Sequence, residues 1–421
     1  MPIQDAFQER LFPMLPEIAA YFGTPFHIYD ETGIRETMHQ LAQAFSGVSG
    51  FREYFAVKAL PNPEILRMIF EAGFGFDCSS VAELELARQL GASREDISFT
   101  STNTSIRELE IALTGDGCIL NLDDLRLLER LEQMQALPEI VSFRHNPGVL
   151  ESSNQIIGAP LESKFGLTRD QIIEGCRRAR QLGVERLGIH AMVVSNERDY
   201  HQIVRTTRLL LDLAGEISTA QSVKFDFINI GGGLGIPYRP EDTPLDLDAM
   251  AAEITTLFQQ FEAQHGYAPK LYMESGRYLT GPHGVLVTEV INRKQTYRTY
   301  IGVDANMSAL MRPGMYGAYH HISVVQNQPA DTQETVDVVG SLCENNDKFA
   351  IHRTLPQIGI GDLLVIHDTG AHGHAMGFNY NGRLRPQELL LCADSSVHLI
   401  RRQETLADYF ATLNFEPKVL R

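Results

Sequence analysis

The chain has 421 residues, of which 43% are hydrophobic and 21% charged, so it is long enough to bury large cores without disulfide support. This composition excludes a disordered, collagen-like or disulfide-stapled protein. Asp and Glu outnumber Lys and Arg by 53 to 36, which gives a net charge of −17. Because nucleic acids and anionic membranes bind to basic surfaces, the charge argues against both as partners.

The sequence also predicts the compartment. Its first residues lack the basic start and apolar run of a signal peptide, and no stretch approaches the roughly 18–20 apolar residues of a membrane span. The cysteines are odd in number, scattered and without CxxC spacing: Cys78, Cys118, Cys176, Cys343 and Cys392. This pattern is typical of free thiols in a reducing compartment. We therefore expect a soluble, cytoplasmic protein.

Short runs of β-branched and aromatic residues alternate with amphipathic helical patterns through the first two thirds of the chain. The predicted strands are 53–58, 73–77, 97–101, 118–122, 140–145, 188–194, 225–230 and 270–275. Capping-box patterns at Ser80, Ser105 and Thr168 mark the starts of three intervening helices. Eight such units favour an α/β fold of the (β/α)8, TIM-like barrel type. A doubly wound open sheet is the alternative, but the glycine fingerprint of its first βα turn is missing.

After about residue 285 the pattern becomes β-rich. Strand-like segments lie at 284–294, 300–305, 334–343, 361–368, 388–394 and 396–402, with few helical patterns between them. They predict a C-terminal β domain of the β-sandwich or Greek-key-barrel type. A further strand-like piece at 24–30 precedes the barrel. We expect a barrel domain over 31–285, and a β-rich domain made of 1–30 and 286–421 that completes the active site.

Polar residues recur where the predicted barrel strands end. They are Lys58, Asp77, Asn121, His145, His190 followed by Ser195, Gly231 to Gly233, and Glu274. Because the carboxyl ends of barrel strands meet on one face, this recurrence predicts a shared pocket.

Each of these signals has a structural as well as a functional interpretation. Lys58 is either a lysine that reaches water from a strand end, or a desolvated amine with a lowered pKa that forms a Schiff base. The glycines in INIGGGLGIPY form either a tight turn or a backbone cradle for phosphate. Glu274 in ESGR is either part of a surface salt bridge or the partner of a cationic ring nitrogen, with Gly276 and Arg277 placed for an anion. The histidine-rich segments around 320 and 367–374 match no metal-ligand spacing, so we expect no metal.

Seven ordered segments resemble the diaminopimelate decarboxylase family. They are FAVKALPNP, GIHAMVVSN, INIGGGLGIPY, MESGRYLTGP, MRPGMYGAYH, LCENNDKFA and HDTGAHGHAMGFNYNGRLRP, and the resemblance extends from about Thr24 to about Tyr409. It implies a pyridoxal 5'-phosphate enzyme with an alanine-racemase-like barrel and a C-terminal β domain.

The resemblance also implies roles for individual residues. Lys58 would carry the cofactor and Glu274 would hold its ring nitrogen. Cys343 would donate a proton to the substrate carbon, with Lys58 as the alternative donor, and Cys343 and Glu344 would enter the site from the partner subunit of a homodimer. The other implied cofactor-binding residues are Asp77, His190, Ser195, Gly232, Gly233, Gly276, Arg277 and Tyr380.

The implied reaction is decarboxylation of meso-2,6-diaminopimelate to L-lysine and CO2. This substrate has a distal amino-acid centre, so its pocket needs both a cation and an anion. Arg312, with Arg277 nearby, would bind the distal carboxylate, Glu344 the ammonium group, and Tyr316 would add a hydroxyl contact, while Tyr380 would reach both cofactor and substrate. Ornithine-type relatives carry aspartate after the cysteine, whereas this sequence has glutamate.

Four departures point to a divergent branch. Met192 stands where the family has a ring-stacking histidine, Val194 replaces a glycine, ESGR replaces the commoner EPGR, and ENND follows Cys343. A thioether still packs on a ring face. The alternatives are a decarboxylase of ornithine, arginine, carboxynorspermidine or a carrier-linked glutamyl group, and a pyridoxal-phosphate-binding protein without turnover. Proteins of the last kind lack the C-terminal β domain, and an alanine racemase would need a tyrosine base in place of the cysteine.

Overall fold

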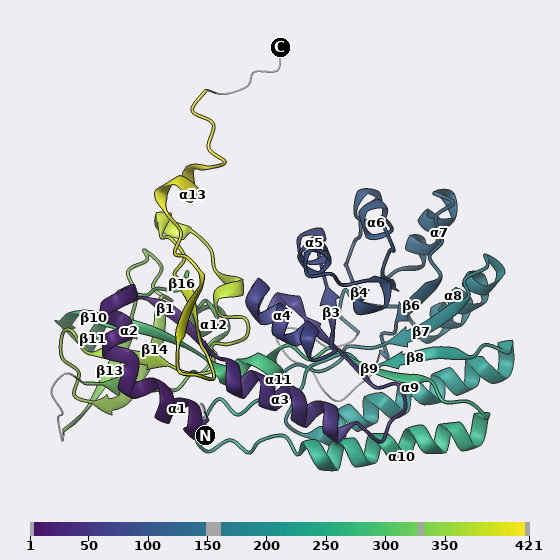
Figure 1. Cartoon of the computed structure of the whole chain (residues 1–421), viewed down its shortest axis with the longest axis horizontal. Coiled ribbons are helices and arrows are strands. Elements are labelled where there is room, and N and C mark those ends of the chain that lie inside the picture. The colour runs from purple at the N-terminus through teal and green to yellow at the C-terminus, as the bar shows by residue number, and fades with distance from the viewer. Residues whose placement is uncertain (1–3, 149–160, 327–331, 417–421) are drawn as a thin grey trace. The chain divides into compact units, whose positions relative to one another are not determined.

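The computed structural model describes residues 4–148, 161–326 and 332–416. The chain divides into two compact units (Figure 1). The barrel unit comprises Ile34–Pro237 and Thr243–Thr280, and the β unit comprises the described parts of Met1–Gly33 and Gly281–Arg421 together with Tyr238–Asp242. The domain boundaries predicted near 30 and 285 do not include this short third segment. It lies in the connection between the seventh and eighth barrel strands.

The barrel unit contains a closed ring of eight parallel strands, as the sequence predicts. The strands are β2 (Arg52–Ala56), β3 (Gly75–Cys78), β4 (Ile97–Phe99), β5 (Ile119–Leu122), β6 (Ile140–Arg144), β7 (Arg186–His190), β8 (Phe225–Asn229) and β9 (Lys270–Met273). Pairing of Glu53 with Met273 closes the ring between β2 and β9. Strand β7 stops four residues before its predicted end, because the chain leaves the ladder after Ala191 donates its N–H to Asn229.

Helices follow the barrel strands in chain order, except α3, which precedes β2, and most of them connect one barrel strand to the next (Figure 1). They are α3 (Glu31–Ala44), α4 (Pro63–Glu71), α5 (Val81–Gln89), α6 (Ile106–Ala112), α7 (Leu125–Gln133), α8 (Arg169–Gln181), α9 (Tyr200–Gln221), α10 (Leu247–His265) and α11 (Arg277–Thr280). Two predicted capping boxes are present, at Ser105 and Thr168. At the third, Ser80 caps α5, but the Glu83 carboxylate accepts from the Ser79 N–H instead.

The β unit is built on one mixed nine-stranded sheet. Its strands are β1 (Phe26–Asp30), β10 (Gly284–Gln295), β11 (Thr299–Val303), β12 (Ile322–Val325), β13 (Gln333–Val339), β14 (Lys348–Pro356), β15 (Leu363–Ile366), β16 (Gln387–Leu391) and β17 (Val397–Arg401). The N-terminal strand β1 lies between β10 and β16. Strands β12 and β14 were not predicted. β12 has only four residues, and the charged residues and histidine of KFAIHRTLP conceal β14.

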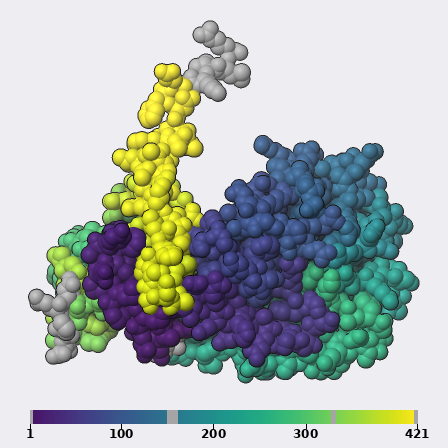
Figure 2. All heavy atoms as spheres, viewed as in Figure 1, coloured from purple at the N-terminus to yellow at the C-terminus, as the bar shows by residue number. Residues whose placement is uncertain are grey.

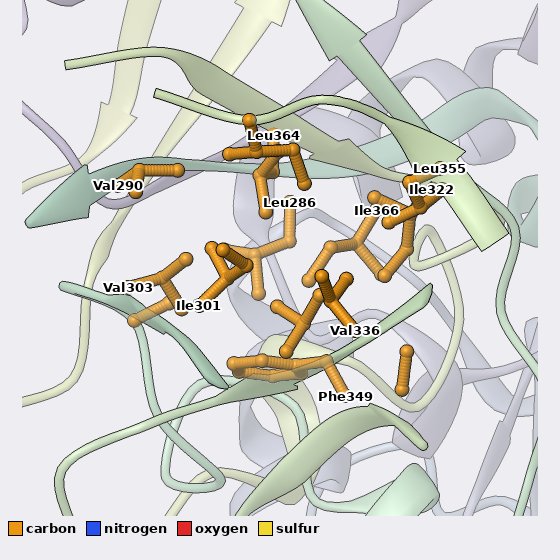
Figure 3. Close-up of a cluster of buried hydrophobic side chains, with 14 of the residues drawn as sticks. Leu286, Val290, Ile301, Val303, Ile322, Val336, Phe349, Leu355, Leu364 and Ile366 are labelled. Carbon is orange, nitrogen blue, oxygen red and sulfur yellow. The ribbon is translucent and has the colours of Figure 1, made fainter. Parts of the chain in front are cut away.

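Alternating side chains of the β unit fill two hydrophobic cores. On β10, Val285 and Val287 pack with α1 (Asp5–Leu11) and α2 (Leu15–Phe22), whereas Leu286 belongs to the core of Figure 3. Each buried Leu or Val side chain stabilises the fold by about 1.5–3 kcal/mol. The second core includes Ala309 and Leu310, and so supports the segment that leads into Arg312.

The C-terminal segment of the β unit contributes little to either core. It carries α13 (Leu406–Phe410), and its large apolar side chains, among them Leu413 and Phe415, are exposed (the yellow segment in Figure 2). Among the residues that the structure describes, no helix is both long and apolar enough to cross a membrane.

Candidate active site

A lysine–aspartate pair lies at the carboxyl end of the first barrel strands. Lys58 stands in the short 3-10 helix η2 (Val57–Ala59) that follows β2, and its Nζ is 3.0 Å from Oδ2 of Asp77 on β3. Asp77 is fully buried and its Oδ1 has no hydrogen-bond partner in the structure, whereas half of the Lys58 side chain is exposed. The Lys58 Nζ is thus held by a buried carboxylate, while half of the Lys58 side chain is accessible.

The electrostatics of this pair correct one prediction. The Asp77 carboxylate raises the pKa of Lys58, and this effect outweighs the burial that would lower it. The lowered pKa, one of the two interpretations that the sequence left open for Lys58, is therefore wrong. Burial, followed by the nearby Glu274 carboxylate, raises the pKa of Asp77. Lys58 and Asp77 therefore form a hydrogen-bonded ion pair in which each group shifts the pKa of the other.

Glu274 is a buried carboxylate that its neighbours keep ionised. Its Oε2 lies 3.1 Å from His190 Nε2, and its Oε1 accepts from Asn229 Nδ2 at 2.8 Å. Burial alone would raise the pKa of this carboxyl, but contacts with His190, Lys58 and Asn229 hold it well below its usual range. A carboxylate kept ionised in a buried position is suited to hold a cationic nitrogen.

Asn229 joins this carboxylate to the glycine loop. Its Nδ2 donates to Glu274, its Oδ1 accepts from the Gly231 N–H at 2.9 Å, and the Gly231 carbonyl accepts from the Glu274 N–H at 2.8 Å. The three bonds form a closed ring. Sequence reasoning did not single out Asn229, although a polar residue at the end of the apolar strand FDFIN is the signal that identifies it.

The glycine loop depends on missing side chains. Gly231 and Gly233 have φ values of +70° and +90°, and a Cβ on Gly232 would lie 2.0 Å from the Glu274 carbonyl oxygen. A Cβ on Gly276 would lie 2.7 Å from Cβ of Ala59 in η2. These glycines therefore let the ends of β8, β9 and β2 approach closely.

Met192 occupies part of the predicted phosphate cradle. The Gly232 N–H donates to Met192 Sδ at 3.2 Å, so this departure from the family pattern contacts the glycine loop itself. Ser195, another predicted phosphate ligand, is partly buried in the loop after β7, and Arg277 is buried at the start of α11.

Within the β unit, Arg312 is buried and held by two side chains. It begins α12 (Arg312–Tyr316), and its Nη1 lies 2.9 Å from both Tyr238 Oη and His320 Nε2. His320 Nδ1 lies 2.7 Å from the His367 carbonyl oxygen, so Nδ1 donates there and Nε2 accepts from the guanidinium. Tyr238 belongs to the short segment Tyr238–Asp242 of the β unit, and no sequence pattern indicates its contact with Arg312. Tyr316, at the other end of α12, is half-buried.

Cys343 lies on a loop whose backbone is held by hydrogen bonds to Asp347 and Asn381. The buried Asp347 carboxylate accepts from the N–H groups of Leu342 and Met307, both at 2.7 Å. The Cys343 N–H donates to Asn381 Oδ1 at 2.7 Å, and Asn381 lies in the 3-10 turn η6 (Tyr380–Gly382). The structure therefore brings together Cys343, Glu344 and Tyr380, three predicted site residues whose side chains are exposed.

Comparison with known proteins identifies the family. Residues 31–281, more than half of the chain, match the family model described as pyridoxal-dependent decarboxylase, pyridoxal binding domain. Protein TabA of Pseudomonas amygdali pv. tabaci is 49% identical over 420 residues, covering 99% of this chain and 97% of the relative. The diaminopimelate decarboxylase of Methanothermobacter thermautotrophicus is 38% identical over 409 residues, covering 96% and 95%. The crystal structure of diaminopimelate decarboxylase from M. jannaschii with L-lysine superposes with a TM-score of 0.86, at 30% identity, over 94% and 93% of the two chains.

The barrel residues fit the cofactor that this family uses. An accessible amine, a buried ionised carboxylate and a glycine turn lie at the ends of neighbouring strands, and buried polar atoms such as Asp77 Oδ1 and His190 Nδ1 have no hydrogen-bond partner in the structure. Such atoms in a native site await a ligand or water. The barrel, the mixed β sheet and the matches along the whole chain make this protein a member of the pyridoxal-dependent decarboxylase family, a carbon–carbon lyase that uses pyridoxal phosphate.

Proposed function

We propose that the protein decarboxylates meso-2,6-diaminopimelate to L-lysine and CO2. The observation that carries this proposal is Arg312, a buried guanidinium fixed by Tyr238 and His320. A positioned arginine is the side chain suited to bind a carboxylate through two parallel hydrogen bonds. Similarity to diaminopimelate decarboxylases over nearly the whole chain supports the same substrate.

The barrel residues would hold the cofactor. Lys58 would attach it, Glu274 would keep its ring nitrogen protonated, and the backbone N–H groups around Gly233 and Gly276, with Arg277 and Ser195, would bind its phosphate. Pyridoxal phosphate supplies the electron sink that accepts the electron pair left on the α-carbon when CO2 departs. The ionised state of Glu274 supports its part in this scheme.

The β-unit residues would serve the substrate. In the proposed site, Arg312 binds the distal carboxylate, Glu344 the distal ammonium group, and Tyr316 and Tyr380 add hydroxyl contacts. Cys343 Sγ donates the proton that replaces CO2 on the α-carbon, with the Lys58 amine as the other possible donor.

We propose that Cys343 and Glu344 act across a homodimer. Both side chains are exposed, while the loop that carries them is anchored by Asp347 and Asn381. A proton donor works best where water is excluded, and a second chain covering this loop would exclude it.

A second candidate substrate class has its own support. Identity to Protein TabA, at 49%, exceeds the 38% identity to the methanogen diaminopimelate decarboxylase, and Met192 contacts the glycine loop where the family pattern has histidine. These observations favour, as the alternative, an amino acid other than diaminopimelate as the substrate.

A CO2-release panel tests the proposal. The holoenzyme is assayed with diaminopimelate, ornithine, arginine, lysine and carboxynorspermidine, with Lys58→Ala as the blank. We expect kcat/KM for diaminopimelate to exceed the others by about 100-fold, since an unmatched charged group in the pocket costs about 1.5–3 kcal/mol. A better substrate without a distal carboxylate would overturn the assignment, and turnover of none of the five would favour the second class.

A further inference from the structure

Glu53 is a buried carboxyl group that the proposed reaction does not use. It lies on β2, five residues before Lys58, and its side chain is completely buried. Its Oε1 accepts a hydrogen bond from the backbone N–H of Ser275, while its Oε2 has no hydrogen-bond partner in the structure. Since an unpaired buried charge destabilises a fold by several kcal/mol, this glutamate needs a physical explanation.

Glu53 supplies a hydrogen-bond acceptor, and its charge is suppressed. Burial raises its pKa well above the usual range, and the nearby Glu274 and Asp77 carboxylates raise it further, against the opposing effect of the Ser275 hydrogen bonds. The buried environment therefore favours the neutral form of this carboxyl. Its contribution to the site is the oxygen that faces Ser275.

Position 275 explains why an acceptor is needed there. This chain reads ESGR at 274–277, where the resemblance implies EPGR as the commoner pattern, and a proline at 275 would have no N–H to satisfy. Ser275 is buried, so its N–H has no access to bulk water. Leaving such a donor without a partner costs about 1–3 kcal/mol.

The two peptides that flank the Cα of Glu274 are held at three points. The Glu274 N–H donates to the Gly231 carbonyl at 2.8 Å, and the Ser275 N–H donates to Glu53. The Glu274 carbonyl lies so close to Gly232 that no Cβ would fit between them. Removing the Glu53 contact would release one side of the peptide that carries the Glu274 side chain.

We propose that Glu53 and Ser275 are a matched pair, in which the Glu53 carboxyl accepts the N–H that a proline at 275 would lack, and that Glu53 is thereby a positioning residue for Glu274. The inference deepens the proposed function, because it rests on Glu274 holding the cofactor ring nitrogen. The pairing would explain how the fold accommodates serine at position 275 of ESGR.

The test is a double-mutant cycle on the full-length protein. The variants are Glu53→Leu, Glu53→Gln, Ser275→Pro and the double variant Glu53→Leu/Ser275→Pro, with Ser275→Ala as the matched control that keeps the N–H. The measurements are the urea midpoint of the cofactor-free protein, the dissociation constant for pyridoxal phosphate, and kcat with the preferred substrate.

We expect Glu53→Leu to weaken cofactor binding about tenfold and to lower the urea midpoint, because the Ser275 N–H loses its partner. Glu53→Gln keeps an acceptor and should stay within about twofold of wild type for both quantities, as should Ser275→Ala. The double variant should return to within about threefold of wild type, because the N–H itself is gone.

Three results would overturn the pairing. They are a Glu53→Leu protein equal to wild type, a Glu53→Gln protein as impaired as Glu53→Leu, and a double variant no better than Glu53→Leu. If Glu53→Leu is insoluble, recovery of soluble protein in the double variant is the readout, and its continued insolubility contradicts the pairing.

The cycle also separates this inference from the proposed function. The urea midpoints are measured without cofactor, so coupling between positions 53 and 275 is detected whatever Glu274 does. Failure of the role of Glu274 would instead appear as unchanged cofactor affinity and kcat in Glu274→Gln.

Discussion

The barrel unit and the β unit hold their candidate residues in opposite ways. In the barrel unit the titratable groups are buried and bonded to one another, as Glu274 is to His190 and Asn229. In the β unit the backbone is anchored by buried groups such as Asp347, while the side chains of Cys343 and Glu344 stand in solvent. The barrel-unit side chains are thus positioned by hydrogen bonds to one another. The side chains of Cys343 and Glu344 are exposed on a loop whose backbone is anchored.

This difference separates two kinds of chemistry. A buried, bonded carboxylate such as Glu274 is ready to bind a cofactor before any substrate arrives. An exposed thiol becomes an effective proton donor only once another surface covers it. Variants in the barrel unit should therefore abolish every activity of the chain, whereas variants in the exposed loop should be complemented by an intact loop from a second chain.

The largest effect is expected for Lys58→Ala. It removes the proposed attachment point for the cofactor and a proposed proton-transfer group worth about 10²–10⁴-fold, so kcat should fall by about 10³-fold or more. Borohydride reduction followed by peptide mass analysis should find the cofactor on the Lys58 peptide of the wild type, with no labelled lysine in the variant. Lys270→Ala is the control. Lys270 begins β9, at the end of the strand away from Glu274, and this variant should keep the label and the activity. A label retained by Lys58→Ala would place the attachment elsewhere.

Mixing two inactive chains tests the exposed loop. Cys343→Ala should lower kcat by about 10²-fold or more, since it removes the proposed general acid. Co-refolding it with Lys58→Ala should restore about a quarter of the wild-type activity, because half of the dimers are hybrids with one intact site each. A mixture as inactive as its components would mean that Cys343 and Lys58 of the same chain work together.

The sequence predicts the barrel unit better than the β unit, because barrel signals are local. Each strand is a short apolar run with its polar residue at the end, as in EYFAVK with Lys58 or KLYMES with Glu274. The order of these runs alone predicts that their ends meet. All eight barrel strands were found this way, whereas β14, with its charged residues and histidine, was missed.

What the sequence did not predict depends on contacts between distant residues. The direction of the Lys58 pKa shift follows from Asp77, 19 residues away. The support of Arg312 by Tyr238 joins residues 74 apart, and Glu53 reaches Ser275 across 222. In the sequence, Glu53 is only the polar first residue of an apolar run. No local pattern carries such information, because it arises when the ring of strands closes.

A smaller effect is expected for Arg312, the residue proposed to bind the substrate. Arg312→Ala removes the proposed charge-assisted contact with the distal carboxylate, worth about 1.5–3 kcal/mol, so KM for diaminopimelate should rise about 10–100-fold. Any turnover of lysine or ornithine, which lack the distal carboxylate, should change much less. Tyr238→Phe keeps the guanidinium but removes one of its supports, and should shift KM in the same direction by a smaller factor. Equal losses on all substrates would contradict binding of a distal carboxylate by Arg312.

The smallest effect is a difference in pH response between the two units. In the β unit, burial lowers the pKa of His27 and His283 to about 4 and that of His367 to about 3. Below pH 6.5 the unfolded chain binds protons that these folded histidines do not, so the free energy of unfolding falls as the pH drops from about 6.5 to about 4, by up to ~1.4 kcal/mol per pH unit for each histidine. In the same unit, burial raises the pKa of Asp368. Protonation of Asp368 in the folded state therefore acts in the opposite direction and offsets part of the destabilisation by the histidines.

The barrel unit should respond with the opposite sign. Burial raises the pKa of Glu53 and Asp77, so the folded state binds protons there that the unfolded state releases, and acidification from pH 7 stabilises it. Hydrogen exchange at pH 5 and pH 7.5, corrected for intrinsic rates, should show lost protection in β1, β10 and β15 and unchanged or increased protection in β2, β3 and β9. His27→Gln, which cannot titrate, should reduce the loss in the β unit, and His398→Gln, at an exposed position on β17, should not. Barrel strands that lose protection first on acidification would contradict a balance in which raised carboxyl pKa values dominate the barrel unit and lowered histidine pKa values dominate the β unit.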